Sequence, residues 1–343
     1  MPTKLIVHVG PHKTGATYIQ RQCVNHRHFL KDNGVLYPET GITGFGHHAI
    51  VKAVRHKKWT TTDLYQNYME EIADQEKVLL SSENFTLLRE KDWLYFKNTI
   101  ENPSILYFAR PISDLLPSLW QTMILHGHSF SFPEFYMSTR GYNELLDPMF
   151  HSYQKQLDNY LDIFGQDSIT LFGYSDLLAS EKDIFECLID KSFDIDISVT
   201  DKRYFNESRN HYQIELLRLL NKKYELQEQR KPAMTVRTAL RQCTESLQEE
   251  IKHINFLLEP YSIKYDLSAA RDEDAAFEKY LMNNFSDQIK SSNDHYFPTD
   301  NRKTINTFDS AAHLDHAVIQ TLNKIYSKIS QYFTVKQPTA KAV

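Results

Sequence analysis

The sequence has few cysteines, and their spacing indicates the cellular compartment. Three cysteines occur in 343 residues, an odd number, far apart and without a C-x-x-C pair. This argues against a disulfide framework or a zinc site and fits a reducing environment. No apolar run reaches the roughly 18 residues of a membrane-spanning helix, and no secretory signal precedes the first apolar run. We therefore expect a cytoplasmic protein without a transmembrane segment.

An excess of charge of one sign is also lacking. The formal net charge is −5, with 39 basic and 44 acidic side chains. Without a global basic field, neither nucleic acid nor an anionic membrane is an expected partner. Any anion site must therefore be local.

Four short apolar runs predict buried parallel strands, because they are nearly continuous rather than alternating. They occupy residues 4–10, 77–82, 104–110 and 168–174, and a short peripheral strand could lie at 34–39. Helical patterns separate the runs, which indicates βαβ crossovers. The predicted fold class is α/β, with a parallel sheet flanked by helices.

The pattern changes from about residue 211 onward. Apolar side chains recur every three or four residues over 236–258 and 314–333, as on one face of a helix. Residues 291–303 read as a loop. We expect an α/β core over 1–210 and a mostly helical part over 211–343. The helical stripes could pack on the core or on another subunit, so the oligomeric state stays open.

The segment HVGPHKTGATY, residues 8–18, follows the first predicted strand and resembles a nucleotide-binding loop with a displaced lysine. Nucleoside-triphosphate loops read G-x-x-x-x-G-K-[ST]. Gly10 and Gly15 keep the glycine spacing and Thr17 keeps the hydroxyl. Ala16, however, takes the place of the lysine, and Lys13 lies three residues earlier.

The strand–loop–helix context favours a phosphate site at this loop. Backbone N–H groups and the positive end of the helix dipole would bind the anion, with hydroxyls of Thr14 and Thr17 as further donors. The donor residues are His12, Lys13, Thr14, Gly15, Ala16 and Thr17. A triphosphate site also needs a magnesium carboxylate at a neighbouring strand end, and no such pattern is present. The loop therefore suits a nucleotide with one 5′-phosphate and no metal.

The stretch PHKTGATY resembles the 5′-phosphosulfate loop, P-K-[ST]-G-T-[ST], of sulfotransferases that use 3′-phosphoadenylyl sulfate (PAPS). That family is an offshoot of the P-loop fold, and its lysine lies where Lys13 lies. Ala16 departs from the usual Thr or Ser. The resemblance covers roughly residues 4–210.

A second signature of that family is an arginine at a strand end and a serine eight residues later, which together hold the 3′-phosphate. The stretch LYFARPISDLLPSLW supplies Arg110 and Ser118 at this spacing. Arg110 would present a planar fork of donors, and Ser118 would lie early in the next helix. We place the N-cap of that helix near Ser113.

The resemblance also implies roles in an in-line displacement at sulfur. Lys13 would stabilise the charge on the leaving bisphosphate. Glu83, at the end of the second apolar run, matches the family's catalytic base, which is glutamate in some glycan-modifying members. His47 and His48 are alternative bases with a suitable reference pKa. They and His126 could instead bind the acceptor, or be ordinary loop histidines.

The resemblance thus implies a sulfotransferase that transfers a sulfuryl group from PAPS to a hydroxyl. The acceptor would be a glycan, a glycolipid or a small alcohol, with a glycan slightly favoured by a glutamate base. One alternative is a divergent small-molecule kinase, which would bind Mg²⁺-ATP and ignore a 3′-phosphate. Another is a non-catalytic relative that binds the nucleotide without transfer.

Overall fold

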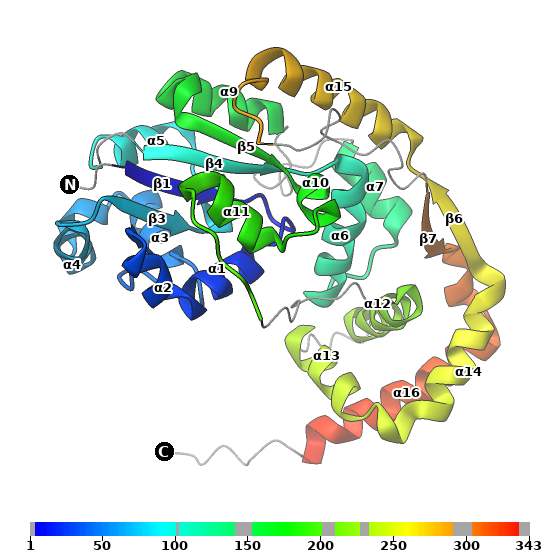
Figure 1. Ribbon diagram of the computed structural model, residues 1–343. Helices are drawn as coiled ribbons and strands as arrows, with labels where there is room; N and C mark the ends of the chain where they lie inside the picture. Colours follow the sequence, from blue (N-terminus) through cyan, green and yellow to red (C-terminus); the bar gives the residue numbers. More distant parts are fainter. Residues whose placement is uncertain are drawn as a thin grey trace. The chain divides into compact units, whose positions relative to one another are not determined.

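A computed structural model gives the architecture over residues 4–100, 103–140, 153–200, 210–226, 233–290 and 304–335 (Figure 1). The chain forms two compact units. The first comprises Met1–Leu115, Asn143–Phe205 and Ala270–Asn301, and the second comprises Leu116–Tyr142, Asn206–Ala269 and Arg302–Val343. The predicted division placed its boundary at residue 210. In this grouping, residues 116–142 belong to the second unit and residues 270–301 to the first. The predicted loop 291–303 lies outside the described residues.

The first unit contains a five-stranded parallel sheet in the order β2-β3-β1-β4-β5. The strands are β1 (Lys4–Val9), β2 (Val35–Leu36), β3 (Lys77–Ser81), β4 (Pro103–Ala109) and β5 (Ile169–Gly173). His8 is registered with Ser81, and Ala109 with Gly173, so the carboxyl ends of four strands lie along one edge. The predicted α/β class and all five predicted strands are confirmed.

Helices cover both faces of this sheet. On one face, α1 (Ala16–Asn25), α2 (Arg27–Asp32), α10 (Tyr174–Ala179) and α11 (Ile184–Phe193) share a hydrophobic core with the strands. The chain also contains α3 (His48–Arg55), α4 (Asp63–Ile72), α5 (Glu90–Lys97) and α9 (Tyr153–Phe164). In the strand order β2-β3-β1-β4-β5, the connection from β1 to β2 runs toward one edge of the sheet. The connections from β3 to β4 and from β4 to β5 run toward the other edge. Right-handed crossovers therefore put α1 on the face opposite to α5 and α9 (Figure 1).

The helix α15 (Ser268–Phe285) and the residues after it return to the sheet. The N–H of Leu171 in β5 donates to the carbonyl of Gln288 at 3.0 Å, and the N–H of Lys290 donates to the carbonyl of Leu171 at 2.9 Å. This pairing covers the outer edge of β5, which would otherwise expose unpaired backbone groups.

The helix α6 (Ile112–Leu125), which follows β4, is capped by a residue distant in the sequence. Buried Asp274 of α15 accepts hydrogen bonds from the backbone N–H groups of Ile112 and Ser113 and from the Ser113 hydroxyl. The helix begins close to the N-cap predicted near Ser113, but Ser113 lies in the first turn, and Asp274 satisfies the free N–H groups there.

The second unit contains α7 (Phe132–Arg140), α12 (His211–Leu226) and α16 (His316–Val335), and an antiparallel pair of β6 (Ser262–Asp266) and β7 (Thr304–Phe308). The predicted stripe at 314–333 lies on α16, except that Leu314 precedes the helix and is 72% exposed. The strand pair was not predicted.

The stripe at 236–258 is divided between two helices, α13 (Ala233–Gln242) and α14 (Gln248–Leu258). At the break, the Thr244 hydroxyl donates to the carbonyl of Leu240 at 2.9 Å, and the Ser246 hydroxyl donates to the carbonyl of Cys243 at 2.9 Å. Such bonds from Ser and Thr compete with the helical backbone ladder. The three- and four-residue spacing of apolar side chains therefore continues across residues 243–247, although the α-helix is interrupted there.

Candidate functional site

The predicted phosphate loop (residues 10–17) joins β1 to α1 through two left-handed residues. Lys13 has φ 71° and Gly15 has φ 80°. The chain is tight at Gly10, where a Cβ would lie 3.0 Å from His8 Nε2 and 3.1 Å from Thr14 Oγ1. Left-handed residues among right-handed ones turn successive N–H groups toward one side, which is the geometry of backbone anion sites.

The first turn of α1 is open to an anion. Gly15 is its N-cap, and among the described residues no side chain caps the helix. The free N–H groups of that turn and the helix dipole thus favour negative charge at this point. The two threonines differ: Thr14 is buried and donates to the carbonyl of Pro11 at 2.7 Å, whereas Thr17 is exposed. Only Thr17 presents its hydroxyl outward; Thr14 uses its proton inside the loop.

Arg110, directly after β4, contacts this loop. Its Nη1 donates to the backbone carbonyl of Lys13, and its guanidinium lies 5.0 Å from the centre of the Tyr174 ring. Its Nε is buried and makes no hydrogen bond to any residue that the structure describes. Tyr174, at the end of β5, also packs against Gly15. Arg110 therefore combines a fixed orientation with a free donor.

The charges of Lys13 and Arg110 at the loop favour an anionic ligand. Burial, and then the nearby charge of Arg110, lowers the pKa of Lys13. Two cations held this close repel each other, and a bound anion would favour the charged form of Lys13.

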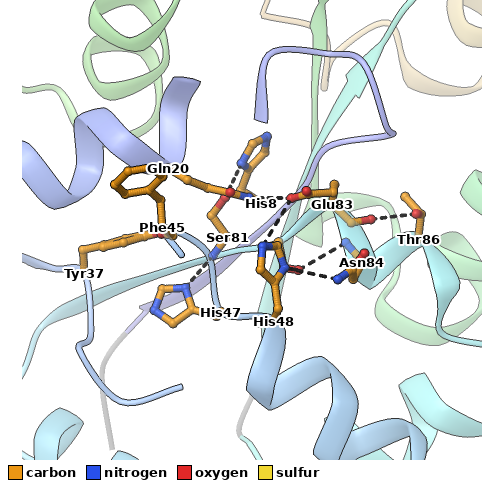
Figure 2. Close-up of polar contacts among 11 residues, drawn as sticks. His8, Gln20, Tyr37, Phe45, His47, His48, Ser81, Glu83, Asn84 and Thr86 are labelled. Carbon is orange, nitrogen blue, oxygen red and sulfur yellow. Dashed lines mark hydrogen bonds and ion pairs between the residues drawn. The ribbon is translucent and has the colours of Figure 1, made fainter. Parts of the chain in front are cut away.

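Glu83, two residues after the end of β3, is the carboxylate of the site (Figure 2). Its Oε2 accepts a hydrogen bond from Gln20 Nε2 at 2.8 Å and lies 4.0 Å from His48 Nε2. Its side chain is 21% exposed. Burial lowers the pKa of His12 in the phosphate loop, whereas the charge of Glu83 raises it.

The two neighbouring histidines have different environments. His47 is fully buried: its Nδ1 accepts from the N–H of Ser81 at 3.1 Å, so its Nε2 carries the proton and donates to the carbonyl of Pro38 at 3.0 Å. Burial lowers its pKa to about 4. The His48 side chain is 25% exposed, and its Nδ1 lies 2.7 Å from Ser82 Oγ. Of the two, only His48 faces Glu83; His47 belongs to the core.

Two predicted residues fall in the second unit. Ser118 is half-buried in α6, and His126 follows α6, exposed, with its Nδ1 2.9 Å from the carbonyl of Thr122. Their roles stay predictions. The structure brings together the phosphate loop, Glu83 and Arg110, which follow three different strands of the first unit.

Sequence reasoning missed Gln20 and Tyr174. Gln20 is one polar residue among several in an amphipathic helix, so no local pattern marks it. Tyr174 is the last residue of the predicted strand 168–174, and its place at the carboxyl edge of the sheet could have identified it.

Two further properties concern the described residues only. None of their helices is long and apolar enough to cross a membrane. Within the same ranges, no three His, Cys, Asp or Glu side chains are grouped as metal ligands would be. The expectation that the reaction needs no metal stays a prediction.

Comparisons with known proteins give little additional information. No family model and no curated protein matches the sequence. Among solved structures, a sulfotransferase from Alicyclobacillus acidocaldarius is similar at 14% identity with a TM-score of 0.38, over 66% of this chain and 96% of that one. At this score, the likeness carries no weight for the activity of this chain.

Proposed function

We propose that this protein is a sulfotransferase that transfers a sulfuryl group from PAPS to a hydroxyl acceptor. The acceptor class is a carbohydrate or glycolipid hydroxyl. One observation carries the proposal: a phosphate loop whose lysine is Lys13, the arginine Arg110 and the carboxylate Glu83 lie at the carboxyl edge of one parallel sheet. Ligands of open α/β sheets bind at this edge.

The proposed donor site uses two groups of contacts. Backbone N–H groups of residues 12–17 and the Thr17 hydroxyl bind the 5′-phosphate at the start of α1. Arg110 binds the 3′-phosphate through donors not used by the Lys13 carbonyl, and Ser118 adds a hydroxyl. Arginine suits this task because its planar fork binds phosphate through two parallel hydrogen bonds.

The proposed chemistry uses two side chains. The acceptor oxygen forms a bond to sulfur while the bond from sulfur to the bridging phosphate oxygen breaks. Lys13 stabilises the negative charge that develops on that leaving oxygen, and this interaction is stronger in the transition state than before it. Glu83 takes the proton of the acceptor hydroxyl.

Calorimetric titration with 3′,5′-bisphosphoadenosine, AMP and Mg²⁺-ATP tests the donor site. Wild type should bind the bisphosphate without metal and more tightly than AMP. Arg110→Ala should reduce bisphosphate affinity by about 30- to 150-fold, the loss of roughly 2–3 kcal/mol. Because Arg110 also contacts the phosphate loop, the ratio of bisphosphate to AMP affinity isolates the 3′-phosphate contribution.

Two results would contradict the proposal. Tight Mg²⁺-ATP binding that does not depend on Arg110 would favour a kinase. Bisphosphate binding without any transfer from ³⁵S-labelled PAPS to sugars or alcohols would favour a non-catalytic binding protein.

A further inference from the structure

Gln20 lies in the helix that follows the phosphate loop and contacts the proposed base. It belongs to the second turn of α1, the helix whose first turn ends the phosphate loop, and it is 1% exposed. Its Nε2 donates to Glu83 Oε2 at 2.8 Å (Figure 2). The orientation of the amide follows from the chemistry, because an ionised carboxylate only accepts hydrogen bonds.

The Gln20 amide packs closely against a glycine, Gly46. A Cβ at Gly46 would lie 2.8 Å from Cδ and Oε1 of Gln20 and 2.9 Å from its Nε2. The backbone φ of Gly46 is outside the left-handed region, so the position needs a glycine for space and not for conformation. The Gln20 amide therefore contacts both Glu83 and Gly46, and position 46 has no room for a residue larger than glycine.

The backbone around Gly46 is fixed. Its carbonyl accepts from the N–H groups of Thr43 and His48, both at 2.9 Å. The N–H of His47 donates to the carbonyl of Ser81, at the end of β3, at 2.8 Å. The loop is thus attached to the end of β3, the strand that Glu83 follows, and it cannot easily move away from Gln20.

We infer that Gln20 is a positioning residue that sets the orientation of Glu83 relative to the donor site. This inference rests on the proposed function. Gln20 and His48 both face Oε2 of Glu83, which leaves Oε1 as the oxygen that accepts the proton of the acceptor. Because α1 carries the start of the donor site and Gln20 one turn later, a single rigid element fixes the distance between donor and base. Reactions of this kind are sensitive to displacements of about 1 Å.

Three variants test the inference. Gln20→Met keeps the approximate volume and removes the donor. Gly46→Ala leaves Gln20 in the sequence but takes its space. Gln22→Met is the matched control, because Gln22 is also buried, at 2% exposure, in the same helix.

The assay measures transfer from ³⁵S-labelled PAPS to a panel of methyl glycosides and short alcohols, and calorimetry measures bisphosphate affinity. Gln20→Met and Gly46→Ala should reduce kcat by about 10- to 100-fold, while the KM for PAPS and the bisphosphate affinity stay within about threefold. Gln22→Met should keep wild-type kcat. A purely structural role would change binding and turnover together.

A double variant separates a direct effect of Gly46 from one through Gln20. If Gly46 acts by leaving room for the amide, Gln20→Ala/Gly46→Ala should be as active as Gln20→Ala alone. A further loss in the double variant, or wild-type kcat in Gln20→Met, would overturn the inference and leave the proposed function intact. A wild type that binds no bisphosphate or transfers to no acceptor would instead overturn the proposed function, and this role of Gln20 with it.

Discussion

The side chain of Arg110 is hydrogen-bonded to the backbone of Lys13, because Arg110 Nη1 donates to the carbonyl of Lys13. Lys13 has φ 71°, a left-handed conformation that costs a residue with a side chain about 1–2 kcal/mol. The hydrogen bond helps to hold this conformation. The arginine expected to bind the 3′-phosphate therefore also shapes the loop expected to bind the 5′-phosphate.

This link predicts that Arg110→Met loosens the ligand-free phosphate loop. Loss of one hydrogen bond from a charged group, worth about 1.5 kcal/mol, should speed amide hydrogen exchange of residues 12–17 by about tenfold. Hydrogen exchange with mass spectrometry measures this. Arg55→Met, at an exposed position, is the control. Unchanged exchange in Arg110→Met would show that the loop holds its shape without the arginine.

Lys13 should be necessary for turnover and much less so for product binding. Lys13→Met should reduce kcat by about 10²- to 10³-fold, because the lysine acts on charge that develops in the transition state. Bisphosphate affinity should fall by less than about tenfold. Lys13→Gly should be equally inactive but more stable than Lys13→Met by about 1 kcal/mol, since glycine accepts φ 71° without strain. Equal stabilities in urea unfolding would contradict this account of the loop.

His8 and His47 should make the protein less stable in mild acid. Both are fully buried, and burial lowers the pKa of each from 6.5 to about 4. The unfolded chain binds protons first, so the free energy of unfolding should fall as the pH drops from about 6.5 to 4, by up to about 3 kcal/mol for each histidine.

Urea unfolding between pH 4 and 8 measures this dependence. His47→Gln should lower stability at pH 7 but reduce the slope below pH 6.5. His56→Gln, at an exposed position, should keep the slope of wild type. A slope that His47→Gln leaves unchanged would mean that this histidine is accessible to protons in the folded state.

Asp274 should stabilise α6 as a cap while its charge opposes folding. Burial is the largest cause that raises its pKa from 3.8 to about 6. A raised pKa in the folded state gives stability that is present below pH 3.8 and lost as the pH rises through 6. Asp274→Asn should remove this loss of stability with rising pH. Asp274→Ala should lower the free energy of unfolding at pH 7 by about 1–2 kcal/mol relative to wild type. Urea unfolding measures both, with exposed Asp272→Asn as control.

The sheet and part of the site follow from local sequence signals. Continuous apolar runs predicted the buried strands, and strand ends predicted where Glu83 and Arg110 lie, because parallel strands share one carboxyl edge. The glycine spacing predicted the phosphate loop. These signals are short in range, so a single stretch of sequence contains each of them.

The remaining features depend on contacts between distant segments. Asp274 caps a helix that begins 162 residues earlier, and the contact of Gln20 with Glu83 spans 63 residues. His47 and His48 are adjacent in sequence, yet one is buried and the other faces the site. No local period distinguishes them, because the turn of the loop around Gly46 decides which ring points inward.

The return of the chain to β5 through Leu171 and Gln288 affects the order in which the protein can fold during synthesis. All five strands of the parallel sheet are translated by residue 173. The residues that cover the outer edge of β5 and cap α6 lie later, within 274–290. Domains generally fold as units as they leave the ribosome. Here, the nascent sheet must wait for about a hundred further residues before its edge is covered and Asp274 reaches α6. During that interval, the exposed edge of β5 is a site where a chaperone could bind or where nascent chains could associate.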